Sequence, residues 1–260
     1  MQFIKIKPIN NSCRNKIIIK KNSLSKNNRF IKKLLFKNSR TDGRSLTTGH
    51  ITSRHKGGGC KHLYRNLVTN NRKFLGVVIS IQYDPNRSSF ISLIFDVVRK
   101  EFFYSLTTNL VGVGSIISSD LISLTLGSRL SVKNIPLGSI VHSISSEDSK
   151  NSCYARSAGT YGQLIQKNLS NYKIKLPSGK ILTISSTGFC TLGMVSNINH
   201  NLCVIGKAGG SILRGVRPSV RGVAMNPVDH PHGGRTNGGR PSVTPWGIPT
   251  KGKPTVKVKK

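Results

Sequence analysis

The chain has 260 residues, of which 41 are lysine or arginine and only 8 are aspartate or glutamate, so its formal net charge is +33. A compact protein with that charge repels itself unless a polyanion supplies the counter-charge, and the length allows one large domain or two small ones. No run of 18 or more apolar residues occurs, which excludes a membrane-spanning helix. Nucleic acid is therefore the expected polyanion.

The five cysteines show no C-x-x-C spacing. An odd number without that spacing argues against both a disulfide framework and a zinc site. We expect all five to be small apolar side chains in a reducing compartment. They are Cys13, Cys60, Cys153, Cys190 and Cys203.

Residues 1–41 carry twelve lysines and arginines and no acidic residue. Such a block is typical of a basic arm that is disordered alone and orders on a polyanion, and it also has the composition of a mitochondrial targeting peptide. Because Met1 is present, we expect a retained arm.

Short runs rich in Val, Ile, Phe and Tyr begin at Phe74. The runs 74–82, 89–95 and 101–106, with the turn sequence Asp84-Pro85-Asn86 after the first, predict an antiparallel meander. A second group of runs covers residues 134–144, 161–166, 172–185 and 189–198, with a hairpin turn at Pro177-Ser178-Gly179.

Nothing longer than a turn has the pattern of an amphipathic helix. Many short strands with Gly and Pro between them predict an all-β fold of one or two small barrels, a kind of fold that commonly binds RNA. Residues 206–260 contain eleven Gly, seven Pro and eleven Lys or Arg with one acid, so we expect an extended segment that approaches phosphates closely.

Residues 54–65 (RHKGGGCKHLYR) combine cations, glycines and one aromatic side chain. Cations neutralise phosphates, glycines let the backbone approach them, and Tyr64 can stack on a base. The alternative interpretation is a flexible basic loop. The spacing of His55, Cys60 and His62 matches no closed zinc site and lacks a fourth ligand, so no metal site is expected.

Asp229-His230-Pro231-His232 is the one place where an acid adjoins histidines, which makes it the best candidate for acid–base or metal chemistry. A Gly- and Pro-rich segment supplies no pocket by itself, and no G-x-S-x-G motif occurs, so a hydrolase is disfavoured. We expect Asp229 to orient a neighbouring His or Arg, or to accept hydrogen bonds from RNA. Residues 206–211 differ from a nucleotide-binding phosphate loop because their lysine comes too early.

Residues 214–233 (RGVRPSVRGVAMNPVDHPHG) and 235–255 (RTNGGRPSVTPWGIPTKGKPT) resemble the C-terminal segment of the L2 family of large-subunit ribosomal proteins, in its bacterial and organellar branch. Five further stretches follow in the family's order: 51–65, 83–94, 134–144, 155–160 and 176–180. The resemblance covers residues 41–253 and leaves the basic arm unmatched.

The resemblance implies four parts: a basic arm (1–41), an oligonucleotide-binding-like barrel with a basic Gly-rich lead-in (42–120), an SH3-like barrel (121–205) and an extended rRNA-binding tail (206–260). It implies a structural constituent of the large ribosomal subunit that binds rRNA near the peptidyl-transferase centre and supports subunit association and tRNA binding. The implied partners are rRNA, neighbouring ribosomal proteins and the small subunit at an intersubunit bridge. No membrane span, small-molecule substrate, cofactor or enzymatic activity is implied, and Mg²⁺ enters only as part of the rRNA.

The family's RNA-contacting motifs, carried onto this sequence, fall in two blocks. The first block is Arg54, His55, Lys56, Gly57, Gly58, Lys61, Tyr64 and Arg65. The second block is Lys207, Arg214, Arg217, Arg221, Met225, Asn226, Asp229, His230, His232, Arg235, Trp246 and Lys251. His230 matches a histidine once suspected of a role in peptide-bond formation, and we interpret it as a residue that positions RNA. No catalytic and no metal-binding residue is assigned.

The sequence departs from the family at three places. Gly234 leads straight to Arg235, where the family commonly has Gly-Glu-Gly between them, and this shortens the loop. Gly210 stands where the family often has Arg, and Ser152-Cys153-Tyr154 replaces a Gly-Gly-x-x pattern, which puts the phosphate contacts at these two places in question.

The DHPHGG and TPWG forms resemble bacterial rather than eukaryotic cytosolic members, and the heavy use of Asn, Lys, Ile and Ser is typical of an AT-rich genome. We expect a mitochondrial ribosome, with a plastid or a bacterial cytoplasm as the alternative. Two other functions stay open: a nucleic-acid-processing enzyme that uses Asp229, His230 and a metal, and an RNA-binding protein outside ribosomes.

Overall fold

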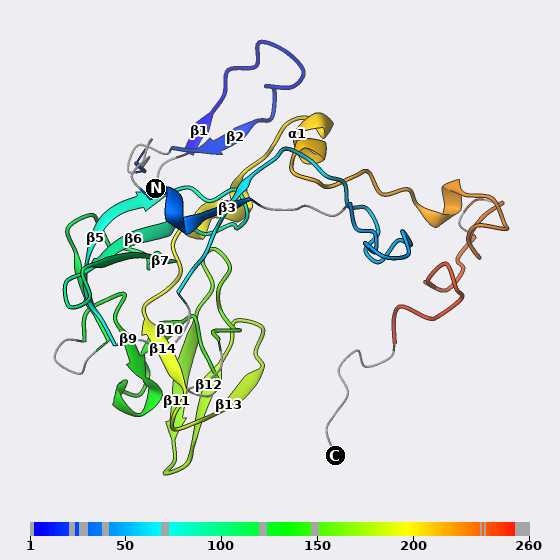
Figure 1. Cartoon of the computed structure of the whole chain (residues 1–260). Coiled ribbons are helices and arrows are strands. Elements are labelled where there is room, and N and C mark those ends of the chain that lie inside the picture. Colours follow the sequence, from blue (N-terminus) through cyan, green and yellow to red (C-terminus); the bar gives the residue numbers. More distant parts are fainter. Residues whose placement is uncertain are drawn as a thin grey trace. The chain divides into compact units, whose positions relative to one another are not determined.

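A computed structural model describes residues 3–20, 24–25, 31–37, 42–68, 73–119, 124–146, 151–234, 236 and 238–252 (Figure 1). The chain divides into two compact units. Unit 1 contains residues 1–40 and 61–207, and unit 2 contains residues 41–60 and 208–260. Unit 2 therefore joins two segments that lie far apart in the sequence.

Unit 1 contains an antiparallel four-stranded sheet in the order β7-β6-β5-β8. Its strands are β5 (Leu75–Gln82), β6 (Ile91–Asp96), β7 (Glu101–Leu106) and β8 (Ile116–Ser118). The meander predicted for the first three is confirmed. In the turn after β5, the Asp84 carboxylate accepts a hydrogen bond from the Asn86 backbone N–H at 3.0 Å, as the turn sequence predicts.

Both faces of this sheet are covered, which explains why β6 is buried along almost its whole length. On one face Phe74 and Phe103 pack edge to face with ring centroids 5.1 Å apart, in a cluster that includes Val78 and Phe90. On the other face a cluster forms around Tyr104, whose hydroxyl donates to the Gln82 side chain at 3.1 Å. Burial of this phenol raises the pKa of Tyr104.

A second antiparallel sheet of unit 1 has six strands in the order β13-β12-β11-β10-β14-β9. The strands are β9 (Arg129–Ser131), β10 (Ile140–His142), β11 (Gly162–Lys167), β12 (Asn171–Lys175), β13 (Ile181–Ser185) and β14 (Phe189–Leu192), and the 3-10 turn η2 (Val132–Asn134) follows β9. Buried and exposed residues alternate in β12 and β13, because only one face covers the core. The predicted hairpin is confirmed: the Leu176 N–H donates to the Lys180 carbonyl at 2.9 Å, and Gly179 has φ +84°.

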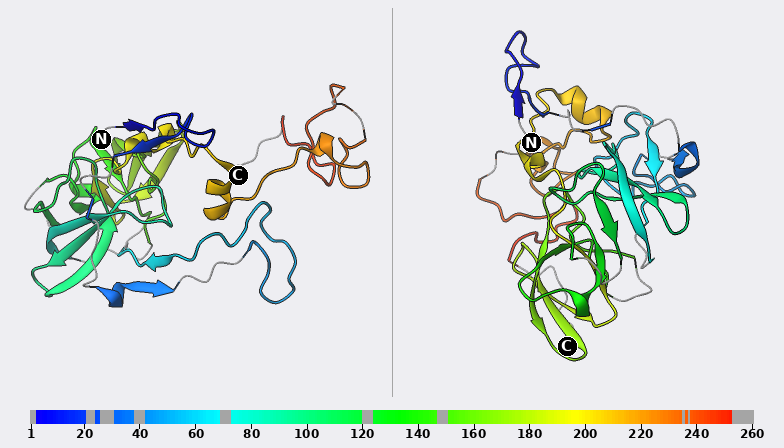
Figure 2. Two further views of the ribbon diagram at one scale, coloured as in Figure 1. Left: turned by 90° about the horizontal axis from the view of Figure 1, so that it is seen from above. Right: turned by 90° about the vertical axis from the view of Figure 1, so that its left-hand side faces the viewer.

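The stretch predicted as a disordered arm contains regular structure in its described part. Strands β1 (Phe3–Lys5) and β2 (Ile17–Ile19) form an antiparallel ribbon, drawn in dark blue in Figure 2. β2 exchanges two backbone hydrogen bonds with Val204, just after the 3-10 turn η3 (Ile198–Leu202). Three consecutive isoleucines favour this extended backbone, and strands of three residues show no alternation that a sequence pattern could reveal.

The remaining elements of unit 1 are also short. A 3-10 turn, η1 (Lys32–Leu34), leads into β3 (Leu35–Lys37), and β3 pairs antiparallel with β4 (Leu63–Arg65). Together with the two sheets they make unit 1 an all-β structure, in agreement with the predicted pair of small barrels.

Unit 2 has no sheet among its described residues. It contains one short helix, α1 (Ala208–Leu213), and the 3-10 turn η4 (Gly222–Ala224), where the sequence predicts only extended chain. Isolated β-bridges join Arg44 to Ile51, Lys56 to Val216 and Val243 to Pro249. Across the described ranges, no helix has the length and apolar character needed to cross a membrane.

The prediction that all five cysteines are small apolar side chains fits Cys190 and does not fit the exposed Cys60 and Cys153, while Cys13 and Cys203 are partly buried. Cys190 is fully buried in the core of the six-stranded sheet, and this burial raises the pKa of its thiol to about 12. Cys60 and Cys153 are exposed, because they lie in loops outside both cores. All five are free thiols in this structure.

His142 of β10 and Arg129 of β9 belong to a buried polar cluster of the six-stranded sheet. His142 is fully buried, and its ring contacts the hydroxyls of Thr108 at 2.8 Å and Ser143 at 2.9 Å. Burial, together with the nearby Arg129 guanidinium, lowers the pKa of His142 to about 3. The Arg129 side chain donates to the Ser152 hydroxyl at 2.9 Å, and burial lowers the pKa of Arg129 to about 10.

This neutral histidine predicts that acid destabilises the fold. Between pH 6.5 and the folded-state pKa near 3, the unfolded chain binds a proton at His142 that the folded chain does not bind, so stability falls as pH falls. From pH 6.5 to 5.0 the loss amounts to roughly 2 kcal/mol. Denaturant unfolding of the full chain at these pH values measures it. His142→Gln should flatten the dependence by that amount, and an unchanged slope in this variant would assign the effect to other groups.

Candidate nucleic-acid interface

The structure pairs two basic segments of unit 2 that the sequence presents separately. Residues 55–60 run beside residues 213–217, and three backbone hydrogen bonds join them: Arg217 N–H to His55 O at 3.0 Å, Gly57 N–H to Gly215 O at 3.0 Å, and Cys60 N–H to Leu213 O at 2.9 Å. The side chains of His55, Lys56 and Arg217 are exposed.

A hollow of about 760 Å³ lies against this pair of segments. Its lining contains four cations and a single acid, so its local field favours anions. The lining residues are Asp42, Arg44, Ile51, Thr52, Ser53, Arg54, His55, Lys56, Gly57, Gly58, Arg217, Pro218 and Trp246. Asp42 and Arg44 line this hollow although neither is among the candidate site residues predicted from the sequence. The Asp-Gly turn signal at 42–43 marks their loop, but nothing in the sequence places that loop beside residue 217.

Trp246 is presented to this hollow by a small hairpin. The Gly247 N–H donates to the Thr244 carbonyl at 2.9 Å, and the Thr244 N–H donates to the Ile248 carbonyl at 2.8 Å. Gly247 has φ +76°, which a side chain at that position would strain. The Arg54 guanidinium lies 4.6 Å from the centroid of the indole ring, a cation–π contact, and 71% of Trp246 is still exposed.

The histidine motif forms a compact turn around His230, which is 8% exposed. The His232 N–H donates to His230 Nδ1 at 3.0 Å, which leaves the proton of the neutral ring on Nε2. His232 Nε2 in turn donates to the Pro241 carbonyl at 2.8 Å, and the Arg240 guanidinium donates to the Pro231 carbonyl at 2.6 Å. Both histidine rings therefore act as hydrogen-bonding supports of the turn.

Gly222 makes room for this arrangement. A Cβ at Gly222 would lie 2.6 Å from His230 Nδ1 and Cε1, well inside van der Waals contact. Met225 and Asn226 supply backbone carbonyls to the same turn: the Gly234 N–H donates to Met225 O at 3.2 Å, and the Asp229 N–H donates to Asn226 O at 3.0 Å.

Asp229 itself is exposed. Among the described residues its carboxylate has no ion pair or side-chain hydrogen bond, so the expected contact with a neighbouring His or Arg is not seen there. Within the same described part of the chain, no three His, Cys, Asp or Glu side chains gather as metal ligands would, and so His55, Cys60 and His62 gain no partners for zinc.

The other predicted residues are distributed between the two units. Arg214 and Arg221 are exposed in unit 2, as is Lys251, whereas Lys61 and Lys207 are exposed in unit 1. Arg235 lies outside the described residues.

Tyr64 and Arg65 belong to β4 of unit 1 and have structural partners there. Arg65 lies 3.7 Å from the buried carboxylate of Asp84, and Arg87 forms a second ion pair with the same group at 2.6 Å. The Arg87 guanidinium also lies 5.9 Å from the centroid of the Tyr64 ring. The predicted 54–65 motif is thus divided: residues 54–58 line the hollow of unit 2, and residues 61–65 belong to unit 1.

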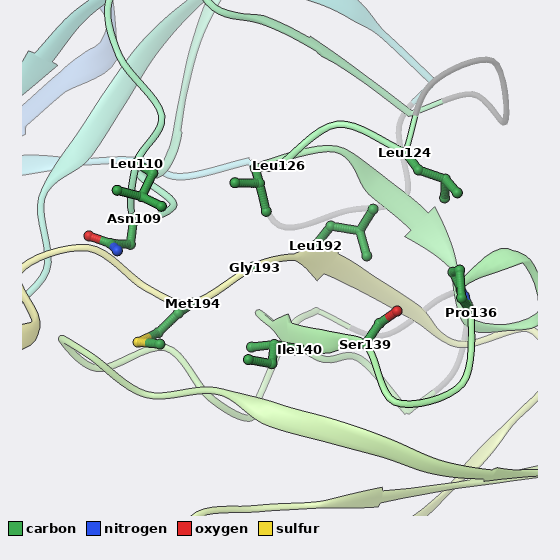
Figure 3. Close-up of a pocket in the computed structure, with 10 residues that line it drawn as sticks. All are labelled: Asn109, Leu110, Leu124, Leu126, Pro136, Ser139, Ile140, Leu192, Gly193 and Met194. Atoms are coloured by element: carbon green, nitrogen blue, oxygen red, sulfur yellow. The ribbon is translucent and has the colours of Figure 1, made fainter.

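A second hollow, of about 410 Å³, lies in unit 1 and has a different character (Figure 3). Its walls come from the loop after β7, the segment before β9, and strands β10 and β14, and most of the lining side chains are aliphatic (Figure 3). None of the described residues that line it is charged, so this hollow lacks the cations that favour phosphate binding. The cationic hollow of unit 2 is therefore the candidate nucleic-acid interface.

The β-rich unit 1 and the cation-lined unit 2 define a basic nucleic-acid-binding protein. Residues 31–119 match the family model described as "Ribosomal Proteins L2, RNA binding N-terminal domain", and residues 125–247 match "Ribosomal Proteins L2, C-terminal domain". The chain belongs to the L2 family of ribosomal proteins, and its function is that of a structural, RNA-binding constituent of the ribosome.

Similar proteins include bacterial and mitochondrial forms. The chain is 42% identical to "Large ribosomal subunit protein uL2" of Methylococcus capsulatus, over 97% of this chain and 93% of that protein. It is 43% identical to "Large ribosomal subunit protein uL2m" of Reclinomonas americana (96% and 92%) and 42% identical to uL2 of Wolbachia pipientis subsp. Culex pipiens (97% and 93%). The resemblance stated from the sequence, to the bacterial and organellar type, is confirmed. The expectation that residues 1–41 are unmatched is wrong, because the first family model begins at residue 31 and the similarity covers 97% of this chain.

Proposed function

We propose that the chain stabilises large-subunit rRNA near the peptidyl-transferase centre, and that it supports subunit association and tRNA binding through contacts with neighbouring ribosomal proteins and the small subunit. The two β cores of unit 1 would anchor the protein, and unit 2 would enter an RNA junction. Lysine and arginine neutralise the backbone there, while loops and aromatic side chains fit unpaired nucleotides.

The observation that supports this most directly is the pairing of residues 55–60 with 213–217. The hollow against this pair is lined by the cations Arg54, Lys56 and Arg217, by the exposed Trp246 and, among the described residues, by a single acid. Proteins that bind single-stranded nucleic acid combine such cations with exposed aromatic rings on which bases stack.

We propose a positioning role and no chemistry for His230. Its Nδ1 already accepts the His232 N–H, and its ring packs against Gly222. A general base needs a free acceptor within reach of the proton that it removes. The hydrogen bond within the turn occupies that acceptor. Mg²⁺ would be present as part of the surrounding rRNA, with no cofactor held by the chain.

We propose a mitochondrial ribosome as the location. The heavy use of Asn, Lys and Ile suits an AT-rich organellar genome, and the uL2m of Reclinomonas americana is as similar as the bacterial relatives. A plastid or a bacterial cytoplasm is the alternative. The four-part division at residues 41, 120 and 205 stays a prediction.

Ultraviolet crosslinking within purified large subunits, followed by mass spectrometry, tests the position of the interface. We expect crosslinked nucleotides on Trp246 and on the 54–58 segment, and these nucleotides should lie in the rRNA that forms the peptidyl-transferase centre. Crosslinks that map only to distant rRNA, or only to unit 1, would contradict the proposal. Subunits depleted of this chain should also fail to join small subunits at magnesium concentrations where complete subunits associate.

A further inference from the structure

We propose that the hollow of unit 2 is a pocket for one unstacked guanine nucleotide. The base would stack on Trp246, the Asp42 carboxylate would accept hydrogen bonds from the edge of the base, and Lys56 and Arg217 would bind the flanking phosphates. This inference rests on the proposed function as an rRNA-binding protein and adds which nucleotide this site selects.

The size of the hollow suits a single nucleotide. Its volume of about 760 Å³ lies within the range of about 300–1,000 Å³ that is typical of small-ligand pockets. A stacked duplex presents no base face to such a pocket, whereas loops and bulges of RNA present unstacked bases to aromatic side chains. The expected occupant is therefore a base that has left its stack.

Trp246 supplies the stacking surface. The hairpin around Gly247 holds the ring at the hollow, and the ring is largely exposed. The Arg54 guanidinium, 4.6 Å from the ring centroid, orients the indole through the cation–π contact. Stacking of a base on such a ring contributes roughly a 5- to 150-fold gain in affinity.

Two glycines of the Gly57-Gly58-Gly59 triplet shape the wall. A Cβ at Gly57 would lie 3.2 Å from Arg217 Cγ, and a Cβ at Gly58 would lie 2.8 Å from Asp42 Oδ1. The bare backbone thus lets the Arg217 stem and the Asp42 carboxylate lie close against it. This packing places a cation and an acceptor on the same wall of the hollow.

Asp42 supplies the selectivity. Among the described residues it is the one acid that lines the hollow, and an ionised carboxylate only accepts hydrogen bonds. Guanine carries two adjacent donors, N1–H and the 2-amino group, which match the two carboxylate oxygens. Adenine and cytosine carry a single amino group on that edge and uracil a single imino group, so each would leave one oxygen without a base donor.

The fluorescence of Trp246 tests the pocket directly, since this is the only tryptophan of the chain. The full chain is titrated with nine-nucleotide RNAs that carry G, A, C or inosine at the centre of oligo-U. Overall binding is measured separately by the anisotropy of labelled copies. We expect G to quench Trp246 and to bind about tenfold more tightly than A, C or inosine, which lacks the 2-amino group.

Three variants separate the contributions. Asp42→Asn should abolish the preference for G over inosine while anisotropy still shows binding of all four RNAs. Trp246→Leu removes the fluorophore, so its binding is measured by anisotropy. This variant should lose the tenfold tighter binding of the G-containing RNA, and Trp246→Phe, which keeps an aromatic face, should recover part of it. Equal quenching by all four RNAs, or a preference for G that survives in Asp42→Asn, would overturn the guanine pocket and leave rRNA binding intact. Absence of any anisotropy change would overturn the proposed function as well.

Discussion

Replacing Lys56, Arg214 and Arg217 by glutamine is expected to weaken binding of the full chain to its rRNA by about 100- to 500-fold at 0.1 M salt. Each lysine or arginine that neutralises a phosphate releases counterions and adds about 0.7 to 0.9 to the slope of log K against log salt. The three residues lie on the paired segments 55–60 and 213–217. Their loss should therefore reduce the slope by about 2 to 3.

A control variant removes the same number of positive charges from a surface outside unit 2. Lys173, Lys175 and Lys180 are exposed on and beside β12 of the six-stranded sheet, outside unit 2. Their replacement by glutamine should change the salt slope by less than about 1. Filter binding at several salt concentrations measures both variants. If the two slopes fell equally, affinity would follow the net charge alone, and the unit 2 interface would be wrong.

Gly222→Ala is expected to disrupt the His230 turn as severely as His230→Ala does. The added methyl would occupy the space of the imidazole, with its Cβ 2.6 Å from Nδ1, so the ring must leave its buried position. Overpacking costs roughly 1–3 kcal/mol, and the lost His232 hydrogen bond adds about 1 kcal/mol or more. The opening equilibrium of the turn should therefore rise by roughly 30- to 1,000-fold.

Hydrogen exchange of the His232 and Gly233 amides measures this opening, and incorporation into large subunits measures its consequence. Gly209→Ala is the control, because no atom lies within 4 Å of a Cβ built at that position of α1. It should leave exchange and incorporation unchanged. The account would be contradicted if Gly222→Ala assembled into active subunits while His230→Ala assembled into inactive ones. That result would indicate a chemical role for the imidazole.

The longer strands could be predicted from the sequence because their patterns are local. Runs such as 75–82 and 181–185 contain enough β-branched residues or enough alternation to define a strand. The three-residue strands β1, β2, β8 and β9 could not be predicted, since they depend on pairing with distant partners. β9, for example, is defined by its antiparallel pairing with β14.

The candidate site was predictable in composition and not in arrangement. The cations, the glycine triplet and Trp246 are visible in the sequence, but residues 57 and 215 are separated by most of the chain and meet only in the fold. Asp42 and Arg44 join the site for the same reason. Arg65 is predicted to contact RNA, but in the fold it lies beside the buried carboxylate of Asp84. The sequence shows Asp84 only as part of a turn and gives no sign that it is buried or that it pairs with Arg65.

Gradient sedimentation of a lysate in low-salt, magnesium-containing buffer, with quantification of this chain against large-subunit rRNA, tests the central claim most directly. One copy of the chain per large subunit is the predicted result, and the rRNA that sediments with it identifies the compartment. A chain found free, or far below one copy per subunit, would contradict a structural role in the ribosome.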